Sequence, residues 1–351
     1  MTILAYLKLL PVVIGVAVYL FFSLIFTVLN LSMNNFRMRF SIFLFLAVLA
    51  GGSAFTQQDP QFTHNMFNNQ AINPGFAGSQ GMISAGMINR QQWMGFPGNP
   101  KTTVFSVNAP VKPLGINSGV GLCFMDDRLG FEKNMTILLD YAYRMELGEG
   151  KLGIGVNLGL LSRAINGKWV IPDSDNHVPA TQDPSIPDAA VTSMTFDMGL
   201  GVFYNTDKIY AGLSTTHLLQ PTVDYGDAVL MHMKRHYYAT AGYLFKLSNP
   251  IFELQPSIFA KSDGASFQMD INMLLLYNKK FWGGVSYRLG DAVAVMAGTE
   301  LPMGLRVGIA YDFTTSALRT YSNGTVEFIL GYNLEVSTDK FSQRYKSVRF
   351  L

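Results

Sequence analysis

The sequence predicts an all-β protein: an outer-membrane antiparallel β-barrel of about 14 strands, with a short N-terminal plug-like segment. Three observations lead to this prediction. Only 14% of the residues are charged, against about 25% in a typical soluble domain, while aromatic residues reach 13% and glycine accounts for 33 residues. After Gly81, apolar and polar residues alternate over most of the chain. An apolar segment of the kind that directs export precedes that region.

Two apolar segments open the chain. Residues 33–56 have the layout of a secretory signal peptide, with two arginines, an apolar run and Gly52-Ser53-Ala54 at the cleavage site. Residues 1–32 are long enough to span a bilayer, but a membrane helix directly before a complete signal peptide would be redundant. We therefore expect translation to start at Met33 or Met38, with residues 1–32 as an upstream extension. A two-helix inner-membrane anchor is the alternative.

The N-terminal segment, residues 57–80, is rich in amides and nearly uncharged, yet it contains five large apolar side chains that a solvated linker would not need. Asp59 followed by Pro60 predicts the start of a short helix, with Phe62 close to a second apolar residue one turn later. The sequence Asn73-Pro74-Gly75 predicts a turn into the first strand. We expect this segment to pack inside or under the periplasmic mouth of the barrel.

Residues 81–335 are predicted to form the transmembrane barrel, because successive side chains of a strand point to opposite faces and these residues alternate with a period of two. A soluble sandwich also alternates. Aromatic residues near the strand ends and the lack of a useful helical period favour a membrane barrel. The clearest expected strands are Thr136–Arg144, Lys151–Leu160, Thr195–Asn205, His236–Lys246, Ser266–Leu276, Phe281–Leu289, Leu305–Phe313 and Thr325–Glu335.

The connections between the expected strands alternate in length, as short periplasmic turns and longer outer loops would. Both termini then lie in the periplasm, with residues 336–351 as a C-terminal tail. The expected short turns are Leu147–Gly150, Thr206–Lys208, Ser248–Pro250, Asn278–Lys280 and Leu301–Pro302. The expected longer loops are Trp93–Pro100, Asp126–Asn134, Ile165–Ala189, Leu218–Met233 and Thr314–Gly324.

Catalytic signatures are scarce, and we expect a non-enzyme with no cofactor and no metal. His232 and His236 lie close in sequence, but the absence of a nearby thiolate or carboxylate favours a solvated loop over a metal site. Glycine-rich runs lack the following helix that a phosphate loop needs. Asp126 and Asp127 beside Arg128 are more typical of a loop ion pair than of acid–base catalysis. The small net charge of +2 gives no argument for nucleic acid.

Four motifs occur in order behind the predicted signal peptide: QDPQF…MFNNQAINPGFAGS, RQQWMGFPGNPKT, GLCFMDDRLGF and FYNTDKIYAGLSTTHLL. Together they resemble the PorP/SprF family of type IX secretion system membrane proteins, and the similarity runs from about Gln58 to Leu351. Phe76 stands where the family often has tyrosine. Residues 1–32 have no counterpart in the family, and the loop around Pro172–Pro187 is individual.

The resemblance implies an outer-membrane barrel of the Bacteroidota, associated with type IX secretion and gliding motility. The implied partners are a secreted adhesin with a type B C-terminal domain, the periplasmic secretion ring, a peptidoglycan-binding protein and outer-membrane lipid. Helping to export or anchor the adhesin is then the expected function. A transport barrel for hydrophobic or small solutes, with the N-terminal segment as a plug, is the alternative.

No catalytic residues come with this resemblance, and the matching motif residues either stabilise the fold and lumen or contact a partner. Arg90 and Trp93 are the best candidates for partner contact, because exposed Arg and Trp often dominate interface affinity. The matching residues are Asp59, Pro60, Phe62, Asn73, Pro74, Gly78, Arg90, Gln92, Trp93, Gly95, Pro97, Lys101, Asp127, Gly130, Phe131, Tyr210, Gly212 and His217.

Overall fold

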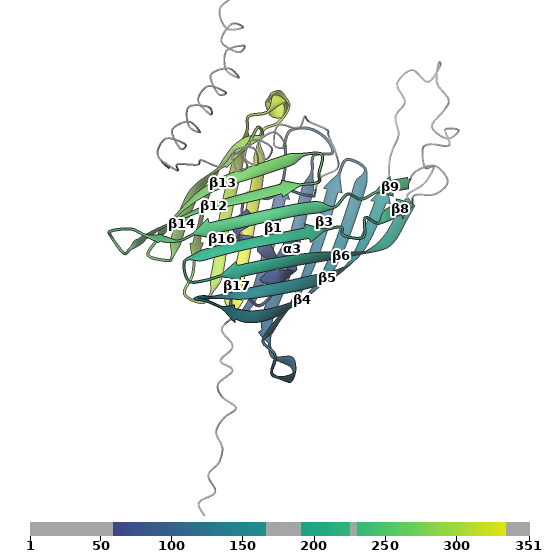
Figure 1. The fold of residues 1–351 in the computed structure, drawn as a ribbon. Helices are drawn as coiled ribbons and strands as arrows, with labels where there is room; N and C mark the ends of the chain where they lie inside the picture. The colour runs from purple at the N-terminus through teal and green to yellow at the C-terminus, as the bar shows by residue number, and fades with distance from the viewer. Residues whose placement is uncertain (1–58, 166–190, 225–229, 335–351) are drawn as a thin grey trace, which may run out of the picture. The chain divides into compact units, whose positions relative to one another are not determined.

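A computed structural model describes residues 59–165, 191–224 and 230–334, and these residues form one closed antiparallel β-barrel (Figure 1). The signal-peptide, upstream-extension and C-terminal-tail predictions, and the loop around Pro172–Pro187, lie outside the described residues. The barrel strands are β1 (Ile83–Gln91), β2 (Lys101–Val111), β3 (Ser118–Leu129), β4 (Glu132–Leu147), β5 (Gly150–Ile165), β6 (Val191–Asn205), β7 (Ile209–Thr216), β10 (His236–Tyr243) continued by β11 (Phe245–Lys246), β12 (Phe252–Ser262), β13 (Phe267–Tyr277), β14 (Phe281–Arg288), β15 (Ala292–Glu300), β16 (Leu305–Thr314) and β17 (Thr325–Leu334).

The sheet closes where β1 pairs with β17, from Ile83 opposite Leu334 to Gln91 opposite Val326. The neighbouring pairs follow chain order, and β10 bridges β7 and β12. Counting β10 and β11 as one interrupted strand gives 14 barrel strands in the described residues, which confirms the predicted number. Closure leaves no row of unpaired edge groups, as a sheet surrounded by lipid requires.

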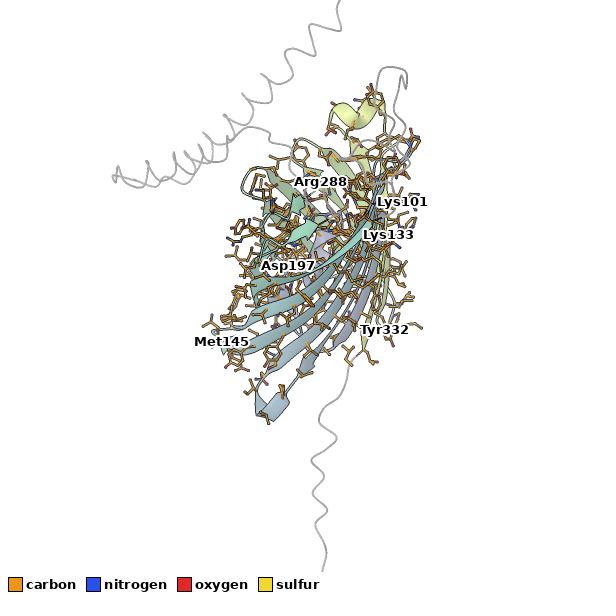
Figure 2. All side chains as sticks on the ribbon, turned by 90° about the vertical axis from the view of Figure 1, so that its right-hand side faces the viewer. Lys101, Lys133, Met145, Asp197, Arg288 and Tyr332 are labelled. Atoms are coloured by element: carbon orange, nitrogen blue, oxygen red, sulfur yellow. The ribbon has the colours of Figure 1, made fainter. Side chains whose placement is uncertain are left out.

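The barrel wall is polar inside and apolar outside, which is the reverse of a soluble domain. In β5, Gly155 and Asn157 are buried, whereas Val156 and Leu158, which alternate with them, are exposed. Exposed large apolar side chains continue around the whole wall, and the buried side chains include many charged and amide groups. Figure 2 shows the outward side chains along the strands. This arrangement decides between a membrane barrel and a soluble sandwich in favour of the barrel.

Exposed aromatic residues gather near both ends of the strands, at the levels expected for the two membrane interfaces. One set lies at the end where the long loops join the strands, here called the long-loop end. The other set lies at the opposite end, called the short-turn end. The long-loop set includes Tyr237, Phe267, Tyr287 and Phe313, and the short-turn set includes Tyr143, Tyr277, Phe281 and Tyr332.

The described connections follow the predicted alternation only in part, because at the long-loop end β12 and β13 are joined by four residues and β14 and β15 by three. At the short-turn end, β4 and β5 are joined by two residues and β6 and β7 by three. The barrel's first strand, β1, begins at this end, and its last strand, β17, ends there. At the long-loop end, residues 217–235 carry a separate ribbon of β8 (Thr222–Asp224) and β9 (Leu230–His232). The predicted outer loop Asp126–Asn134 is wrong, because β3 and β4 pair as far as Leu129 and Glu132 around Gly130-Phe131. Gly130 has φ +58°, which suits a two-residue turn.

The helix predicted from Asp59-Pro60 is also wrong. The segment instead has the single turns η1 (Asn65–Phe67), α3 (Asn69–Ile72) and η2 (Pro74–Phe76). Its Thr, His, Asn and Gln side chains bond to the barrel wall, so the segment follows the wall's hydrogen-bonding groups and not a helical repeat. No helix in the described part of the chain is long and apolar enough to cross a membrane.

Candidate functional site

Residues 59–81, here called the luminal segment, run inside the barrel from the long-loop end to the short-turn end. Asp59 contacts Thr216, which ends β7 at the long-loop end. Gly78 is bonded to Asn108 of β2 near the opposite end, its N–H donating to Oδ1 at 3.1 Å. Figure 1 shows α3 surrounded by the strands. The described part of the chain therefore enters β1 only after passing through the lumen.

A track of inward-facing glycines makes room for the middle of this segment. A Cβ added at Gly155 would overlap the backbone of Pro74 and Gly75, and one at Gly201 would overlap the side chain of Asn73. At Gly119 a Cβ would overlap the carbonyl of Ala77. Glycine in a strand interior often marks close approach of another backbone, and here that backbone belongs to the same chain.

The turn at Asn73 is held by hydrogen bonds to itself and to the wall. Asn73 Oδ1 accepts the Gly75 N–H at 2.9 Å, as predicted for a turn, and Nδ2 donates to the Val202 carbonyl at 3.0 Å. Arg144 Nη1 donates to the carbonyls of Gly75 and Ala77, each at 3.3 Å. Because these groups are buried, leaving them unpaired would be costly.

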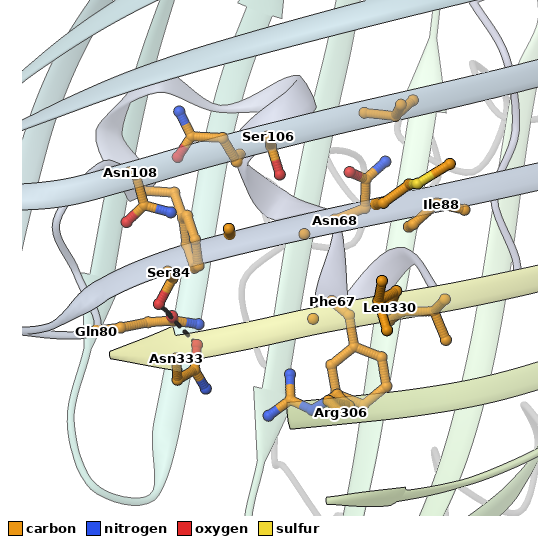
Figure 3. Close-up of a pocket in the computed structure, with 18 residues that line it drawn as sticks. Phe67, Asn68, Gln80, Ser84, Ile88, Ser106, Asn108, Arg306, Leu330 and Asn333 are labelled. Atoms are coloured by element: carbon orange, nitrogen blue, oxygen red, sulfur yellow. Dashed lines mark hydrogen bonds between the residues drawn. The ribbon is translucent and has the colours of Figure 1, made fainter. Parts of the chain in front are cut away.

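The apolar residues of the segment form a core with the inner wall. Phe62 and Met66 belong to one buried cluster with Leu274 and Trp282, among others. The Phe67 and Trp282 ring centroids are 5.2 Å apart, and the Arg306 guanidinium lies over the Phe67 ring, 4.6 Å from its centroid. The close-up in Figure 3 shows Phe67 and Arg306 side by side. This core explains why an amide-rich segment carries large apolar side chains.

A charged cluster lies behind the segment at the closing seam. Arg90 donates to Glu327 and Asp312 at 2.9 and 2.8 Å, and all three side chains are at most 2% exposed. Arg288 bridges Asp312 and Asp270, at 3.0 and 3.2 Å. Each carboxylate accepts hydrogen bonds from a guanidinium, and this pairing offsets the cost of burying both groups.

The luminal segment supplies further partners to these charges. Thr63 N–H donates to Glu327 Oε2 and its hydroxyl to Asp312 Oδ1, at 2.8 and 2.6 Å. His64 N–H donates to Glu327 Oε1 at 2.8 Å, and Gln61 Nε2 donates to Asp270 Oδ2 at 2.9 Å. Gln70 bonds the carboxylate of Asp140 on the facing wall. The wall and the segment therefore form one hydrogen-bonded network.

A second polar cluster surrounds Asp59. His217 lies between two carboxylates, with Nε2 3.0 Å from Asp59 Oδ1 and Nδ1 2.6 Å from Asp197 Oδ2. Tyr238 donates its hydroxyl to Asp59 Oδ2 at 2.5 Å. Lys261 Nζ donates to the Asp59 carbonyl at 2.8 Å. The long-loop end of the luminal segment is thereby held to β7, β10 and β12.

The charges of this cluster shift the pKa values of two groups outside the strands. Burial by itself would raise the pKa of the Asp59 carboxyl, but the facing His217 and His236 hold it well below its usual value. Burial would lower the pKa of His217, but the charge of Asp59 and the hydrogen bond to Asp197 raise it to about 9. Each group thus favours the charged form of the other.

Small cavities remain between the segment and the wall. One of about 40 Å³ lies beside Phe67, Ser84 and Arg306 (Figure 3). Another of about 60 Å³ lies between Asp59 and Asn134. A larger cavity, about 610 Å³, opens at the short-turn mouth and is lined by Gly78, Ser79, Met82, Ala109, Lys112, Arg144, Glu146 and Lys151 among others.

The predicted site residues fall into two groups. The first group is luminal and lies on the segment or against it: Asp59, Pro60, Phe62, Asn73, Pro74, Gly78, Arg90, Gly212 and His217. Tyr210 belongs to the same group and stacks on Phe203, which in turn contacts Phe76 of the segment. The second lies at the long-loop end: Gln92, Trp93, Gly95, Pro97, Lys101, Asp127, Gly130 and Phe131. There the Gly130 N–H donates to the Gly98 carbonyl at 2.9 Å, and the Thr102 hydroxyl donates to Asp127 at 2.6 Å.

Arg90 requires a correction, because a side chain that is 1% exposed inside the lumen cannot contact a partner at the surface. His232 and His236, the two histidines considered as a metal site from the sequence, are also not brought together. His232 is exposed on β9 and bonds Thr222, whereas His236 lies beside Asp59. Arg128 does pair with Asp126, at 3.0 Å on the surface, but at the end of a strand and not in a loop.

Sequence reasoning missed four charged residues of the inner wall near the seam, Asp270 on β13, Arg288 on β14, Asp312 on β16 and Glu327 on β17. The sequence did contain a signal for these residues, because each is a charged residue that alternates with lipid-facing apolar residues along its strand. A charge at such a position must face the lumen and needs a partner there.

The family model described as type IX secretion system membrane protein PorP/SprF matches residues 54–332. No curated protein matches the chain.

Solved structures with a similar fold include outer-membrane barrels of low sequence identity. The CymD monoaromatic hydrocarbon channel is 12% identical with a TM-score of 0.47, over 77% of this chain and 92% of that one. The Ralstonia pickettii toluene transporter TbuX is 10% identical with a TM-score of 0.46, over 77% and 93%. The Acinetobacter baumannii outer membrane protein Omp33 is 8% identical with a TM-score of 0.43, over 72% and 98%.

Proposed function

Because the chain belongs to the type IX secretion system membrane proteins of the PorP/SprF family, we propose that it acts there without enzymatic chemistry, helping to export or anchor a secreted adhesin with a type B C-terminal domain. It is an outer-membrane component of that secretion system. The proposed partners are the adhesin, the periplasmic secretion ring and a peptidoglycan-binding protein.

The observation that best supports a docking function over solute transport is the filled lumen. The luminal segment bonds to both sides of the wall, through Glu327 and Asp270 at one side and Asp140 at the other. The cavities left beside it, about 40 and 60 Å³, have room for a few water molecules at about 10–15 Å³ each. Solute passage would require the whole network to open.

The two ends of the barrel offer different docking surfaces. At the long-loop end, Trp93 has φ 50° and a half-buried side chain. Its backbone N–H donates to the Thr325 hydroxyl at 3.0 Å, and this bond holds the backbone that carries the side chain. At the short-turn mouth, the cavity of about 610 Å³ carries Lys112, Arg144 and Lys151 beside Glu146. We assign the first surface to the exported adhesin and the second to periplasmic partners.

Co-purification tests this function. The tagged full-length barrel, extracted in detergent, is expected to retain the type B C-terminal domain of its proposed adhesin partner. Trp93→Ala is expected to weaken retention at least tenfold, since a Trp anchor contributes about 2 kcal/mol or more. Met303→Ala, at an exposed turn of the opposite end, is the matched control. Loss of solute uptake on deletion, with adhesin display intact, would instead support the transport alternative.

A further inference from the structure

Asp59, His217 and His236 are placed together by three separate parts of the chain at the long-loop end of the lumen. One potential ligand atom from each residue lies within 4.8 Å of the others, and both histidines are buried. We propose that this cluster binds a divalent first-row transition metal ion through the two imidazoles and the Asp59 carboxylate. The ion would join the start of the luminal segment to β7 and β10.

The orientation of both rings supports metal binding. His217 Nδ1 faces Asp197 Oδ2 at 2.6 Å, and His236 Nδ1 faces the Lys234 carbonyl at 3.0 Å. With Nδ1 donating to an oxygen in each ring, Nε2 is the nitrogen left for a metal. In His236 it already accepts a hydrogen bond, and in His217 it becomes available when the proton shared with Asp59 leaves. Both Nε2 atoms face Asp59, at 3.0 Å from Oδ1 and 3.3 Å from the backbone nitrogen.

The spacing fits a small contraction on binding. Metal–ligand distances of about 2.0–2.2 Å place tetrahedral ligand atoms about 3.4 Å apart. One ligand atom from each residue already lies within 4.8 Å of the others. His236 presents Nδ1 to the Asp59 carboxylate, at 3.9 Å from Oδ2, so its ring would turn to bring Nε2 to the ion. His217 would exchange its Nε2 proton for the metal, and His236 would give up the bond from the Asp59 N–H.

A second observation at the same place also indicates a missing ligand. The cavity of about 60 Å³ is lined by Asp59 and His217 together with Asn134 and Asp197. Oδ1 of Asn134 and Oδ1 of Asp197 have no hydrogen-bond partner among the described residues, although both residues are only 5% exposed. Buried acceptors of this kind call for a water, a donor or a cation. Water molecules bound to the metal would complete its coordination and bond both oxygens.

The local charge permits a cation. Three carboxylates line the cavity, from Asp59, Asp127 and Asp197, against the single guanidinium of Arg163. Lys261 lies behind Asp59 and bonds its carbonyl, not its carboxylate. Two imidazoles and one carboxylate form a ligand set common to Zn²⁺ and Fe²⁺ sites, and zinc is a practical probe because it has no redox chemistry.

The test uses the full-length barrel purified in detergent, stripped with a chelator and titrated with Zn²⁺. Wild type is expected to bind one equivalent, counted by elemental analysis after desalting. His236→Gln and Asp59→Asn are expected to weaken binding at least tenfold, and Asp197→Asn by tenfold to a hundredfold through loss of the Nδ1 partner. His232→Gln, an exposed histidine outside the cluster, is the control and should bind as wild type does.

A heat-dependent shift in gel mobility shows that each variant barrel is folded. X-ray absorption of the zinc-loaded wild type needs no variant, and a shell with two imidazoles at about 2.0–2.1 Å is expected. Absence of stoichiometric zinc in wild type, equal affinity in His236→Gln, or a shell without imidazole would each overturn the proposal and leave the cavity to ordered water.

Discussion

Arg90 and Glu327 face each other directly across the seam where the first and last strands close the barrel. Arg90 Nη1 donates to Glu327 Oε2 at 2.9 Å, and both side chains are at most 1% exposed. The same carboxylate accepts the backbone N–H groups of Thr63 and His64. One carboxylate therefore connects barrel closure to the position of the luminal segment.

Glu327→Gln should destabilise the barrel by about 3 kcal/mol, because removing one member of a buried ion pair leaves an uncompensated charge. Urea unfolding in lipid vesicles, followed by tryptophan fluorescence, measures this loss. Asp126→Asn breaks the exposed pair with Arg128, which is 59% exposed, and should cost at most about 1 kcal/mol. Equal losses in the two variants would show that the seam pair has no special contribution.

Gly155→Ala should release the middle of the luminal segment, because the added Cβ overlaps the backbone of Pro74 and Gly75. The measurement is chymotrypsin cleavage after Phe67 and Phe76, which should be faster than in wild type. Gly86→Ala is the control, since its Cβ meets only the Ser106 hydroxyl at 3.4 Å. An unchanged cleavage rate in Gly155→Ala would mean that β5 moves to accommodate the added methyl group while the luminal segment stays in place.

The barrel could be predicted from the sequence because its cause is local. Alternation such as Val156 and Leu158 around Asn157 fixes which side of a strand faces lipid, and that pattern is visible within ten residues. The error at Asp126–Asn134 has the same origin. The polar run there is typical of a loop, but two of its members, Asp127 and Asn134, are cross-strand neighbours in the wall.

The luminal network could not be predicted in the same way. Thr63 and Glu327 are 264 residues apart, and Asp59 and His217 are 158 apart. Alternation shows that Glu327 faces inward, but it does not say which of the 14 strands, or which part of the segment, lies opposite. That information depends on the register of every strand between them.

Leu158→Arg should cost about 2–4 kcal/mol, the penalty for a charge at the middle of the lipid-facing wall. Leu158 is 60% exposed and is flanked by Leu139 and Met198 on the neighbouring strands. Leu114→Arg, at a fully exposed turn of the short-turn end, should be nearly neutral. Folding free energies in vesicles give both values, and similar costs at the two sites would contradict the placement of Leu158 in the lipid.

Deleting residues 59–80 should open the barrel to ions without preventing its closure. The seam is made by nine residue pairs between β1 and β17, none of which involves the segment. Removing the segment exposes the inner charges of Arg90, Asp270 and Asp312 to the lumen, where water can solvate them. Stepwise conductance in planar bilayers is therefore expected for the deletion variant and not for wild type.

A heat-dependent gel shift identifies correctly closed barrels before the conductance of the deletion variant is recorded. A synthetic peptide of residues 59–80 supplies the internal control. Because the glycine track and the seam charges remain in the deletion variant, the peptide should rebind and reduce the conductance, whereas a peptide with Asn73 and Pro74 changed to alanine should do so less effectively. Equal conductance in wild type and the deletion variant would show that the segment does not limit ion passage, and the filled lumen would then no longer argue against transport.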